Sequence, residues 1–426
     1  MYNYNQLVRI IADEKSKEVF ARLYGNRSKS QPKRYMELLR KFGHRFGRDS
    51  DGIRFFSTPG RTEICGNHTD HNHGMVIAAG VNLDIVAAAA PNDSGVIRIK
   101  SEGYKLIEID ISDLSVKNAE KNKSPSMVRG IVAGFKRAGY RTGGFDAFTS
   151  SDILKGSGLS SSAAFEVIVG TMLNFFYNDS AVTPVEIAKI SQYAEREYFG
   201  KPSGLMDQTA CAVGGVIAID FRKPSEPVIE TIDCDMSSRG YRLCIVDTKG
   251  NHSRLTGEYA AITDEMAQVS RLLGVDYLRE TDIDSLISKA VEIRRQLGDR
   301  AYLRAMHYFA ENKRVQKQTE ALKKGDIRAF LRLINESGNS SAQFLQNIFP
   351  ARNIKNQSLY VALSLASYIL DGQGACRVHG GGFGGTTQNF VPANKVKRFK
   401  KTLEDVFGEG SCLFLETGRQ GGTVVF

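Results

Sequence analysis

The spacing of apolar residues predicts helices at the start of the chain. In residues 1–48, apolar positions recur at roughly helical spacing up to Leu23 and again from Tyr35 to Phe42. A polar stretch, GNRSKSQPKR, lies between the two segments. The pattern predicts an N-terminal helical extension of two amphipathic helices that packs against the main body, and it carries no obvious chemistry.

Strand patterns begin at residue 53 and alternate with helical ones up to residue 224. The segment IRFFS (53–57) reads as a strand that ends at Thr58. The run MVIAAGVNLDIVAAAA (75–90) reads as a buried strand because it is apolar almost throughout. The other elements predicted here are a β-hairpin over 96–112, a helix over 126–138, a strand near 145–149, a helix after residue 160 and a helix over 184–198.

The second half of the chain is mixed as well. Residues 242–248 predict a strand, and the glycine-dense segment ACRVHGGGFGGTTQNFV (375–391) predicts a tight hairpin, because strand periodicity flanks it. Helices are predicted, with breaks, over 257–297, 301–323, 326–336 and 358–370. Strands and helices interspersed in this way indicate a mixed α/β (α+β) protein.

The length of the chain indicates more than one domain. At 426 residues it exceeds the size of one ordinary hydrophobic core. A polar turn, SEP (225–227), marks the boundary that we expect. The predicted division is therefore an extension over 1–48, an N-terminal domain over 49–224 and a C-terminal domain over 225–426.

Composition excludes several classes of protein. The net charge is +10, but the basic residues are spread out and form no recognisable DNA- or RNA-binding module, so we expect no nucleic-acid partner. No window approaches 18 apolar residues, and the N-terminus lacks a signal-peptide core, so we expect no membrane association. The six cysteines include no CxxC pair, which favours free thiols in a reducing cytoplasm.

The segment LKGSGLSSSAAFEV (154–167) is a candidate phosphate-binding loop. Gly156 and Gly158 precede three serines that run into a predicted helix. Such a turn gathers unpaired N–H groups at the positive end of the helix dipole, where an anion binds well. Serine hydroxyls add donors and can ligate Mg²⁺. A serine-capped helix after an ordinary loop explains the residues of this segment equally well.

A second candidate site is the polar segment GRTEICGNHTDHNHG (60–74). His68, His71 and His73 with Asp70 have the ligand types of a transition-metal site, although their spacing is not that of one helix face. A hydrogen-bonding site for a polyhydroxylated ligand fits Asp, Asn and His at least as well, and a polar turn is the third interpretation. Farther along, Asp207 lies where a loop meets a helix. Three roles are open to a carboxylate there: a helix cap, a buried partner of a cation or a general base.

Four separated motifs, in order, resemble those of the galactokinase family of GHMP kinases. GRTEICGNHTDHNHG resembles the signature GRxNxIGEHTDYNxG, and LKGSGLSSSAAFEV resembles PxGxGLSSSAAxEV. SGLMDQ is similar to CGIMDQ, and CRVHGGGFGG is similar to SRMTGGGFGG. A supporting segment, DTKGNHSRLTGEY, resembles NSxVxHxLxxSEY. The resemblance runs from about Phe55 to the C-terminus, whereas residues 1–48 exceed the family's usual lead-in and are not covered well.

The resemblance implies a two-domain GHMP kinase fold with the active site between the domains. The glycine turn (380–385) then belongs to the C-terminal domain, and the last strand can return to the N-terminal domain. The implied reaction is ATP-dependent phosphorylation of the anomeric hydroxyl of galactose or a related sugar. By position, Asp207 is the general base, and Arg61 lowers its pKa and stabilises charge on the γ-phosphoryl group.

The resemblance also implies the remaining site residues. The ATP phosphates are held by Gly156, Ser157, Gly158, Leu159, Ser160, Ser161 and Ser162. The Mg²⁺ ligand positions are Ser162 and Glu195. Sugar hydroxyls are bound by His68, Asp70, Gly204 and Tyr259. The expected partners are therefore a sugar and ATP, in a monomer or weak homo-oligomer.

The sugar signature departs from the family in one informative way. The family's Asn position holds Glu63, and its Glu position, which contacts the C6 end of the sugar, holds Asn67. An amide donates as well as accepts, whereas a carboxylate repels an anion. A substrate altered at C6 or otherwise related to galactose is therefore an alternative: galacturonate, arabinose or N-acetylgalactosamine. Equally, Asn67 and Glu63 together can rebuild the family's contact.

Two further alternatives concern the class of protein. Some galactokinase-like proteins are sugar- and ATP-sensing regulators without turnover. The complete set Arg61, Asp207, Ser162 and Glu195 favours an enzyme over a regulator. Another GHMP enzyme, acting on a non-sugar alcohol, is disfavoured by the HTDxN segment within residues 60–74, which we call the sugar loop.

Overall fold

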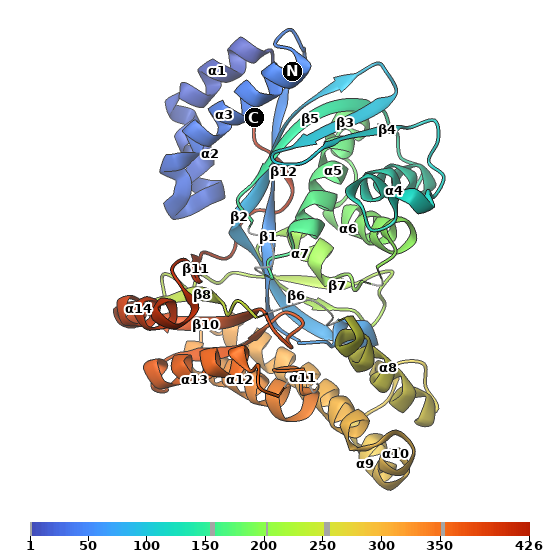
Figure 1. Ribbon diagram of the computed structural model, residues 1–426, viewed down its shortest axis with the longest axis vertical. Helices are drawn as coiled ribbons and strands as arrows, with labels where there is room; N and C mark the ends of the chain where they lie inside the picture. Colours follow the sequence, from blue (N-terminus) through green and yellow to red (C-terminus); the bar gives the residue numbers. More distant parts are fainter. Residues whose placement is uncertain (1, 154–157, 202, 251–255, 351–353) are drawn as a thin grey trace.

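A computed structural model describes residues 2–153, 158–201, 203–250, 256–350 and 354–426. Its larger sheet has the strand order β12-β1-β2-β5-β3-β4, with β6 beside β2 and β7 beside β6 (Figure 1). Neighbouring strands are antiparallel except β3 and β5. The strands are β1 (Arg54–Cys65), β2 (Met75–Asn92), β3 (Val96–Ser101), β4 (Leu106–Asp110), β5 (Gly144–Ser151), β6 (Val216–Asp220), β7 (Val228–Ile232) and β12 (Thr423–Val424).

Both faces of this sheet are covered, which explains why β2 is apolar almost throughout. Side chains alternate between faces along a strand. Phe55 of β1 and Ala88 of β2 belong to a cluster with the N-terminal helices, whereas Phe56 and Ala87 belong to the main core with α4 and α5. Because β2 is buried on both faces, its sequence does not alternate between apolar and polar residues.

The helices on the core side of the sheet carry two of the predicted motifs. They are α4 (Ser124–Arg137), α5 (Ser161–Asn178), α6 (Pro184–Tyr193), the π-helical turn η4 (Ala194–Phe199) and α7 (Met206–Val213). The candidate phosphate loop directly precedes α5, and Asp207 lies in the first turn of α7. The predicted helices at 126–138 and after residue 160 are confirmed.

The N-terminal extension contains three helices, where the sequence predicted two. They are α1 (Tyr4–Ala12), α2 (Glu14–Tyr24) and α3 (Gln31–Phe46), with a short 3₁₀ segment, η1 (Gly25–Ser30), before α3. Asp13 divides the first predicted helix, because its backbone is extended and its carboxylate accepts from Lys15 N at 2.8 Å as an N-cap. The GNRSKSQPKR stretch is largely helical as well.

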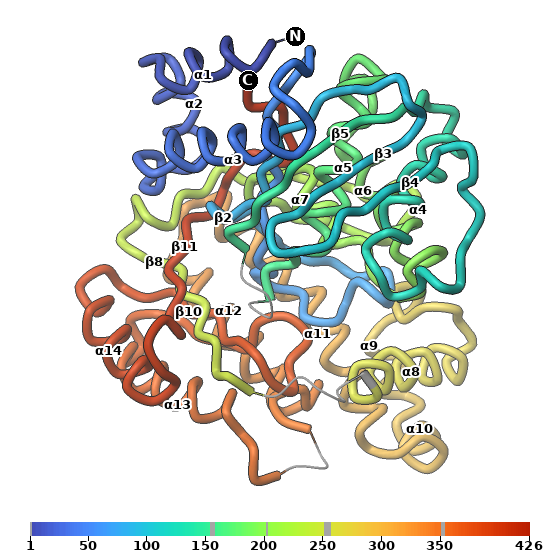
Figure 2. The backbone as a smooth tube through the Cα atoms, turned by 45° about the horizontal axis from the view of Figure 1, so that its top comes forward, coloured from blue at the N-terminus to red at the C-terminus, as the bar shows by residue number. Residues whose placement is uncertain are grey.

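The C-terminus anchors the extension to the sheet. Val425 N donates to Phe55 O at 2.8 Å. The Phe426 ring packs edge-on against Phe20 at 5.5 Å between centroids and against Phe55 at 6.3 Å. Figure 2 shows the C-terminus beside α1–α3. The last residues of the chain therefore join the extension and β1 in one apolar cluster.

A smaller sheet, with the order β11-β8-β10-β9, lies in the lower half of the molecule, away from α1–α3 (Figure 1). Its strands are β8 (Tyr241–Asp247), β9 (Ala375–His379), β10 (Thr386–Pro392) and β11 (Cys412–Leu415). The remaining elements are α8 (Thr256–Leu272), η5 (Leu278–Glu280), α9 (Ile283–Ser288), α10 (Ala290–Leu297), α11 (Asp299–Lys323), α12 (Ile327–Ser340), η6 (Ser341–Leu345), α13 (Ser358–Leu370) and α14 (Val396–Phe407). Helices α13 and α14 share an apolar cluster with β8 and β10.

Two differences from the sequence predictions affect the site. Strand β1 continues to Cys65 instead of ending at Thr58, so residues 60–65 of the predicted polar loop are strand. Strand β7 pairs with β6 in the larger sheet, so the chain leaves that sheet after Ile232 and not at 224. The predicted hairpin at 375–391 is confirmed as β9 and β10, with Thr386 opposite His379.

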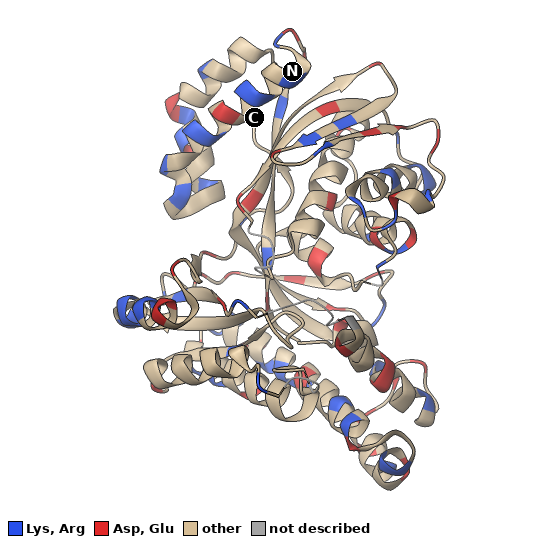
Figure 3. Cartoon of the chain, in the orientation of Figure 1, with Lys and Arg blue, Asp and Glu red and all other residues tan. Residues whose placement is uncertain are grey.

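Basic side chains gather on α14, as Figure 3 shows. Lys401 is 2.6 Å from Asp405, one turn farther along the helix. Lys395 Nζ, just before α14, donates to Ile369 O and Leu370 O at the end of α13. Part of this positive charge is therefore used within the fold. None of the described helices is long and apolar enough to cross a membrane.

Candidate active site

An arginine–aspartate pair joins the segment 60–74 to the segment SGLMDQ (203–208). Arg61 extends from β1, and its Nε donates to Asp207 Oδ1 at 2.7 Å. Arg61 Nη1 donates to Gly158 O at 2.5 Å, and Ser160 Oγ donates to Asp207 Oδ2 at 2.5 Å. Residues about 50 to 150 positions apart thus meet at the start of α5.

The electrostatic environment keeps Asp207 ionised. Burial raises the pKa of this carboxyl, but the charge and the hydrogen bond of Arg61 outweigh that effect, and the pKa falls to about 2. The side chain of Arg61 is 8% exposed, whereas that of Asp207 is 31% exposed. The carboxylate is therefore charged at neutral pH and still reachable by a substrate, as a proton acceptor requires.

The described part of the phosphate loop leaves the start of α5 without a side-chain cap. Ser160 occupies the N-cap position, yet its hydroxyl bonds Asp207 instead of an N–H group of the helix. Its φ of +54° lies in the left-handed region, which residues with a side chain rarely adopt. The interpretation as a serine-capped helix is therefore wrong, and the first N–H groups of α5 keep their capacity to bind an anion.

Gly158 is required by close packing in this loop. Its φ is +71°, and a Cβ there would lie 3.0 Å from His379 Nδ1 and 3.0 Å from Thr386 Oγ1. The phosphate loop therefore packs directly on the β9–β10 hairpin of the smaller sheet. Gly156 and Ser157 lie outside the described residues, whereas Leu159, Ser161 and Ser162 are described.

A buried acidic cluster lies beside the start of α5. Gln208 Nε2 donates to Glu195 Oε2 at 2.8 Å and to Glu166 Oε2 at 3.1 Å. Lys201 Nζ donates to Glu195 Oε1 at 2.8 Å. Glu166 Oε1 is buried and has no hydrogen-bond partner among the described residues. Burial, and then the charge of Glu195, raises the pKa of Glu166 well above its usual value.

This cluster suits Mg²⁺, which prefers oxygen ligands. Ser162 precedes Glu166 by four residues on α5, so both side chains lie on the same face of the helix. Through the Gln208 amide, that face is joined to the carboxylate of Glu195. The Ser162 hydroxyl and the Glu195 carboxylate are oxygen donors of the kind that this ion prefers.

The histidines of the sugar loop do not converge on a metal site. Among the described residues, no group of three His, Cys, Asp or Glu side chains could hold a metal ion. His73 stacks on Tyr277 with 3.6 Å between ring centroids, and His68 Nε2 bonds Gly381 O at 3.0 Å. The transition-metal interpretation of this loop is therefore wrong.

His68 and Asp70 leave groups that can bind hydroxyls. Burial lowers the pKa of His68 to about 3, with a further contribution from His71, so the ring is neutral. Because Gly381 O can only accept, Nε2 carries the hydrogen and Nδ1 is an acceptor. Asp70 Oδ1 accepts from His71 N at 3.0 Å, and Asp70 Oδ2 lies against Gly204.

Tyr259 lies on the glycine turn next to this loop. Its hydroxyl donates to Gly382 O at 3.1 Å, and its ring packs on Phe383 at 5.6 Å between centroids. A Cβ on Gly381 would lie 2.4 Å from the Tyr259 ring. Tyr259 therefore fixes the glycine turn over the sugar loop, while the ring remains half-buried.

Asn67 and Glu63 are buried inside the protein. Asn67 is fully buried, and its amide donates to Glu63 Oε1 at 3.1 Å and to Gly380 O at 2.7 Å. Its Oδ1 accepts from Asn347 Nδ2 at 2.8 Å and from Ser341 Oγ at 3.4 Å. Both amide hydrogens and both lone pairs of the side chain are thus used by protein groups, and this geometry does not offer Asn67 to a sugar.

Glu63 forms an ion pair that was not apparent from the sequence. Arg377 Nη2 donates to Glu63 Oε1 at 2.9 Å, and Arg377 Nη1 donates to Ile64 O at 2.7 Å. Arg377 is fully buried, and Glu63 is 5% exposed. A buried charge needs such a partner, and this one joins β1 to β9.

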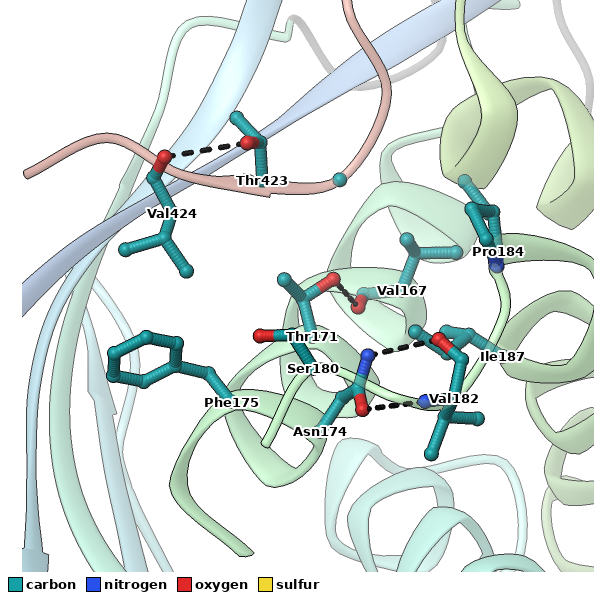
Figure 4. A pocket seen from close by; sticks show the side chains of 12 residues that line it. Val167, Thr171, Asn174, Phe175, Ser180, Val182, Pro184, Ile187, Thr423 and Val424 are labelled. Atoms are coloured by element: carbon teal, nitrogen blue, oxygen red, sulfur yellow. Dashed lines mark hydrogen bonds between the residues drawn. The ribbon is translucent and has the colours of Figure 1, made fainter. Parts of the chain in front are cut away.

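A cavity of about 400 Å³ lies elsewhere, between α5, α6 and β12 (Figure 4). Its polar side chains bond neighbouring backbone: Thr171 Oγ1 donates to Val167 O at 2.8 Å, and the Asn174 amide pairs with both backbone groups of Val182 at 2.9 Å. None of the described candidate site residues lines it. The cavity is therefore separate from the Arg61–Asp207 site.

Comparisons with known proteins identify the family. The model of the GHMP kinases N terminal domain matches residues 126–215, and the galactokinase galactose-binding signature matches residues 40–91. A galactokinase of Streptomyces coelicolor is 31% identical over 377 residues, which cover 86% of this chain and 91% of the relative. A galactokinase of Actinobacillus pleuropneumoniae is 32% identical over 82% of this chain and 87% of its own length. The chain belongs to the galactokinase family.

Solved structures agree with this assignment at the level of the fold. A galactokinase of Lactococcus lactis, solved in complex with galactose, has a TM-score of 0.77 at 24% identity and covers 90% of this chain and 98% of its own. A mevalonate kinase of Methanococcus jannaschii has a TM-score of 0.60 at 16% identity over 87% of this chain and 99% of its own. The predicted mixed α/β GHMP kinase fold is confirmed, as is the expected class, an ATP-dependent sugar kinase.

Sequence reasoning missed several residues around the site of this galactokinase-family protein. Gln208 bridges two carboxyls, and Lys201 reaches one of them. His307 Nε2 bonds Asn67 O at 2.9 Å from α11. The position of Gln208 directly after Asp207, in SGLMDQ, was a signal that could have indicated the first contact. His307 lies 240 residues from its partner, with no local pattern to mark it.

Gly204 is a testable positioning residue for Asp70. A Cβ at position 204 would lie 2.0 Å from Asp70 Oδ2, so Gly204→Ala must displace that carboxylate. We expect the KM for the sugar to rise about tenfold, the loss expected for one hydrogen bond to a charged group. The KM for ATP should stay unchanged. Steady-state kinetics with each substrate varied in turn measures both, and an unaltered sugar KM would show that Asp70 does not bind the sugar.

Proposed function

We propose that this protein phosphorylates the anomeric hydroxyl of galactose with ATP. The observation that carries the proposal is the setting of the ionised Asp207, which is held by Arg61. It accepts from Ser160 at the uncapped start of α5, and three residues before it Gly204 lies against Asp70 of the His68–Asp70 loop. The first of these surfaces suits phosphate and the second suits hydroxyls. A base beside both is placed to remove a proton from a hydroxyl that faces a phosphoryl group.

In this proposal Asp207 accepts the proton of the anomeric hydroxyl as that oxygen attacks the γ-phosphorus. The new bond joins the sugar oxygen to phosphorus, the bond from the γ-phosphorus to the bridging oxygen breaks, and ADP leaves with that electron pair. Arg61 keeps Asp207 ionised and offers positive charge near the transferring group. The first N–H groups of α5, with Ser161 and Ser162, bind the phosphates. Phosphoryl transfer needs mainly such positioning and charge neutralisation.

We further propose that Mg²⁺ is held by Ser162 and Glu195. When bound, the ion neutralises charge on the ATP phosphates and orients them. The chain's own contribution is the fixed geometry of the donors: Gln208 orients the Glu195 carboxylate, and α5 positions the Ser162 hydroxyl.

The C6 end of the sugar supports a second candidate, a kinase of a C6-altered or related sugar. Where the family has a carboxylate at this position, Asn67 here is buried and saturated by protein bonds. Removing that carboxylate removes repulsion of an acidic C6 group such as that of galacturonate. Galactose remains the first candidate because the relatives that match most of the chain are galactokinases.

A substrate panel tests the proposal. ADP release is measured with galactose, galacturonate, arabinose, fucose and N-acetylgalactosamine at equal concentrations. We expect galactose to give the highest kcat/KM. A higher value for galacturonate or arabinose would replace galactose by that sugar. Sugar- and ATP-dependent binding to a protein partner, without turnover of any sugar, would instead identify a regulator.

A further inference from the structure

Lys201 reaches from the surface to a buried carboxylate of the proposed Mg²⁺ site. Its side chain is 53% exposed, whereas that of Glu195 is 2% exposed. The two are joined by a bond of 2.8 Å from Nζ to Oε1. An ion pair between two exposed side chains contributes little, but a buried carboxylate depends on its partner. The contact therefore neutralises a charge that would otherwise be buried alone.

The surroundings contain few other cations for this carboxylate. Arg61 already donates to Asp207 and to Gly158 O. Gln208, the second partner of Glu195, is neutral. Among the described residues, Lys201 is thus the cation in direct contact with Glu195. The ammonium occupies one of the two oxygens that Glu195 could offer to a metal ion, and the Gln208 amide occupies the other.

We propose that Lys201 is a mobile cation of the phosphoryl-transfer site: its ammonium holds Glu195 in the free protein, and when MgATP binds, the metal replaces it there and the ammonium moves to the phosphate oxygens. The inference rests on the proposed function to the extent that this site binds MgATP. Two cations at the same carboxylate oxygen repel each other, so metal binding there favours release of the ammonium. Lysine is suited to this exchange, because its charge is a compact group on a flexible four-carbon stem. In this scheme Lys201 is a positioning residue for the metal and a phosphate ligand afterwards.

The exchange predicts that loss of the Lys201 ammonium changes the affinities for metal and for nucleotide in opposite directions. Lys201→Met removes the competing ammonium and also the phosphate contact. We expect Mn²⁺, used as a spectroscopic substitute for Mg²⁺, to bind the nucleotide-free protein about tenfold more tightly. We expect the Mn²⁺ complex of a non-hydrolysable ATP analogue to bind about tenfold more weakly. Both changes correspond to one hydrogen bond to a charged group. A merely structural lysine would move neither affinity, or both in the same direction.

The experiment uses the full chain without sugar. Electron paramagnetic resonance of free Mn²⁺ gives the metal affinity, and titration calorimetry gives the nucleotide affinity. Lys201→Arg, which keeps the charge, should restore most of the nucleotide affinity. Lys189→Met is the matched control, because Lys189 forms a 2.7 Å pair with Glu186 within α6 instead of with Glu195, and it should behave as wild type.

The outcomes separate this inference from the proposed function. Opposite shifts in Lys201→Met support the exchange, and an unchanged Mn²⁺ affinity or an unchanged nucleotide affinity overturns it. Because no sugar is present, failure of the substrate panel would leave these affinities interpretable. A wild-type protein that binds neither Mn²⁺ nor nucleotide would overturn both proposals.

Discussion

Replacing Asp207 with asparagine is expected to lower kcat by about 10²- to 10⁴-fold, the usual contribution of a general base. Asparagine has nearly the same shape and can still accept the Arg61 Nε hydrogen bond, but it cannot take up a proton. The proposed phosphate contacts come from α5 and not from Asp207, so the affinity for ATP should change little. Steady-state kinetics and nucleotide titration together measure the effect.

A matched control tests whether the loss is chemical. Asp220 is 2.6 Å from Arg279 and 25% exposed, close to the values for the Asp207–Arg61 pair, but it lies away from the start of α5. Asp220→Asn should retain wild-type kcat. Near-wild-type turnover of Asp207→Asn would refute the base assignment.

The pH dependence of wild type gives an independent check on Asp207. Its pKa of about 2 lies below that of an unfolded aspartate, so the group is ionised at and above that unfolded value and becomes protonated only as the pH falls towards 2. An acid limb in kcat at pH 5 to 6 would therefore have to come from another group.

The chemistry of this site could be predicted from sequence because it lies in short motifs. Arg61 and Asp207 were each singled out by their local segment, and the structure brings them to 2.7 Å. Their pairing could not be derived from spacing, because 146 positions separate them. The order of the motifs, read as a family resemblance, supplied that step.

The interpretation of Asn67 shows where a motif alone is insufficient. Position 67 lies in a sugar-binding signature, and the sequence suggested that its amide faces the sugar. The structure directs it inward to Gly380 and Asn347, which lie about 300 residues later in the chain. The tertiary fold brings these partners to Asn67, and the pattern of residues 60–74 does not indicate which distant residues they are.

Elements of the fold were predicted best where periodicity was long. The hairpin of β3 and β4 and the helices α4 and α11 follow clear patterns. Strand β1 was cut short, because Pro59 and Gly60 normally end strands. In the structure they lie at an irregularity between Pro59 and Arg61, where the register with β2 shifts and the strand continues.

Loss of the Arg377–Glu63 ion pair is expected to be the most destabilising single change around the site. Arg377→Met leaves Glu63 buried without its cation, which typically costs about 3–5 kcal/mol of unfolding free energy. Urea denaturation followed by circular dichroism measures the loss. The double variant Glu63→Gln with Arg377→Met should recover most of it, because the remaining amide is neutral and still accepts from Asn67.

Arg332→Met is the matched control for this prediction. Arg332 and Glu336 form a 2.9 Å pair of the same type, but their side chains are 68% and 44% exposed. Water screens that pair, so its loss should cost less than about 1 kcal/mol. Each variant removes one arginine from one glutamate, so the contrast measures what the buried setting of Arg377, including its bond to Ile64 O, adds to the cost. Equal stability of Arg377→Met and Arg332→Met would contradict the role of Arg377 as the buried tie between β9 and the sugar loop.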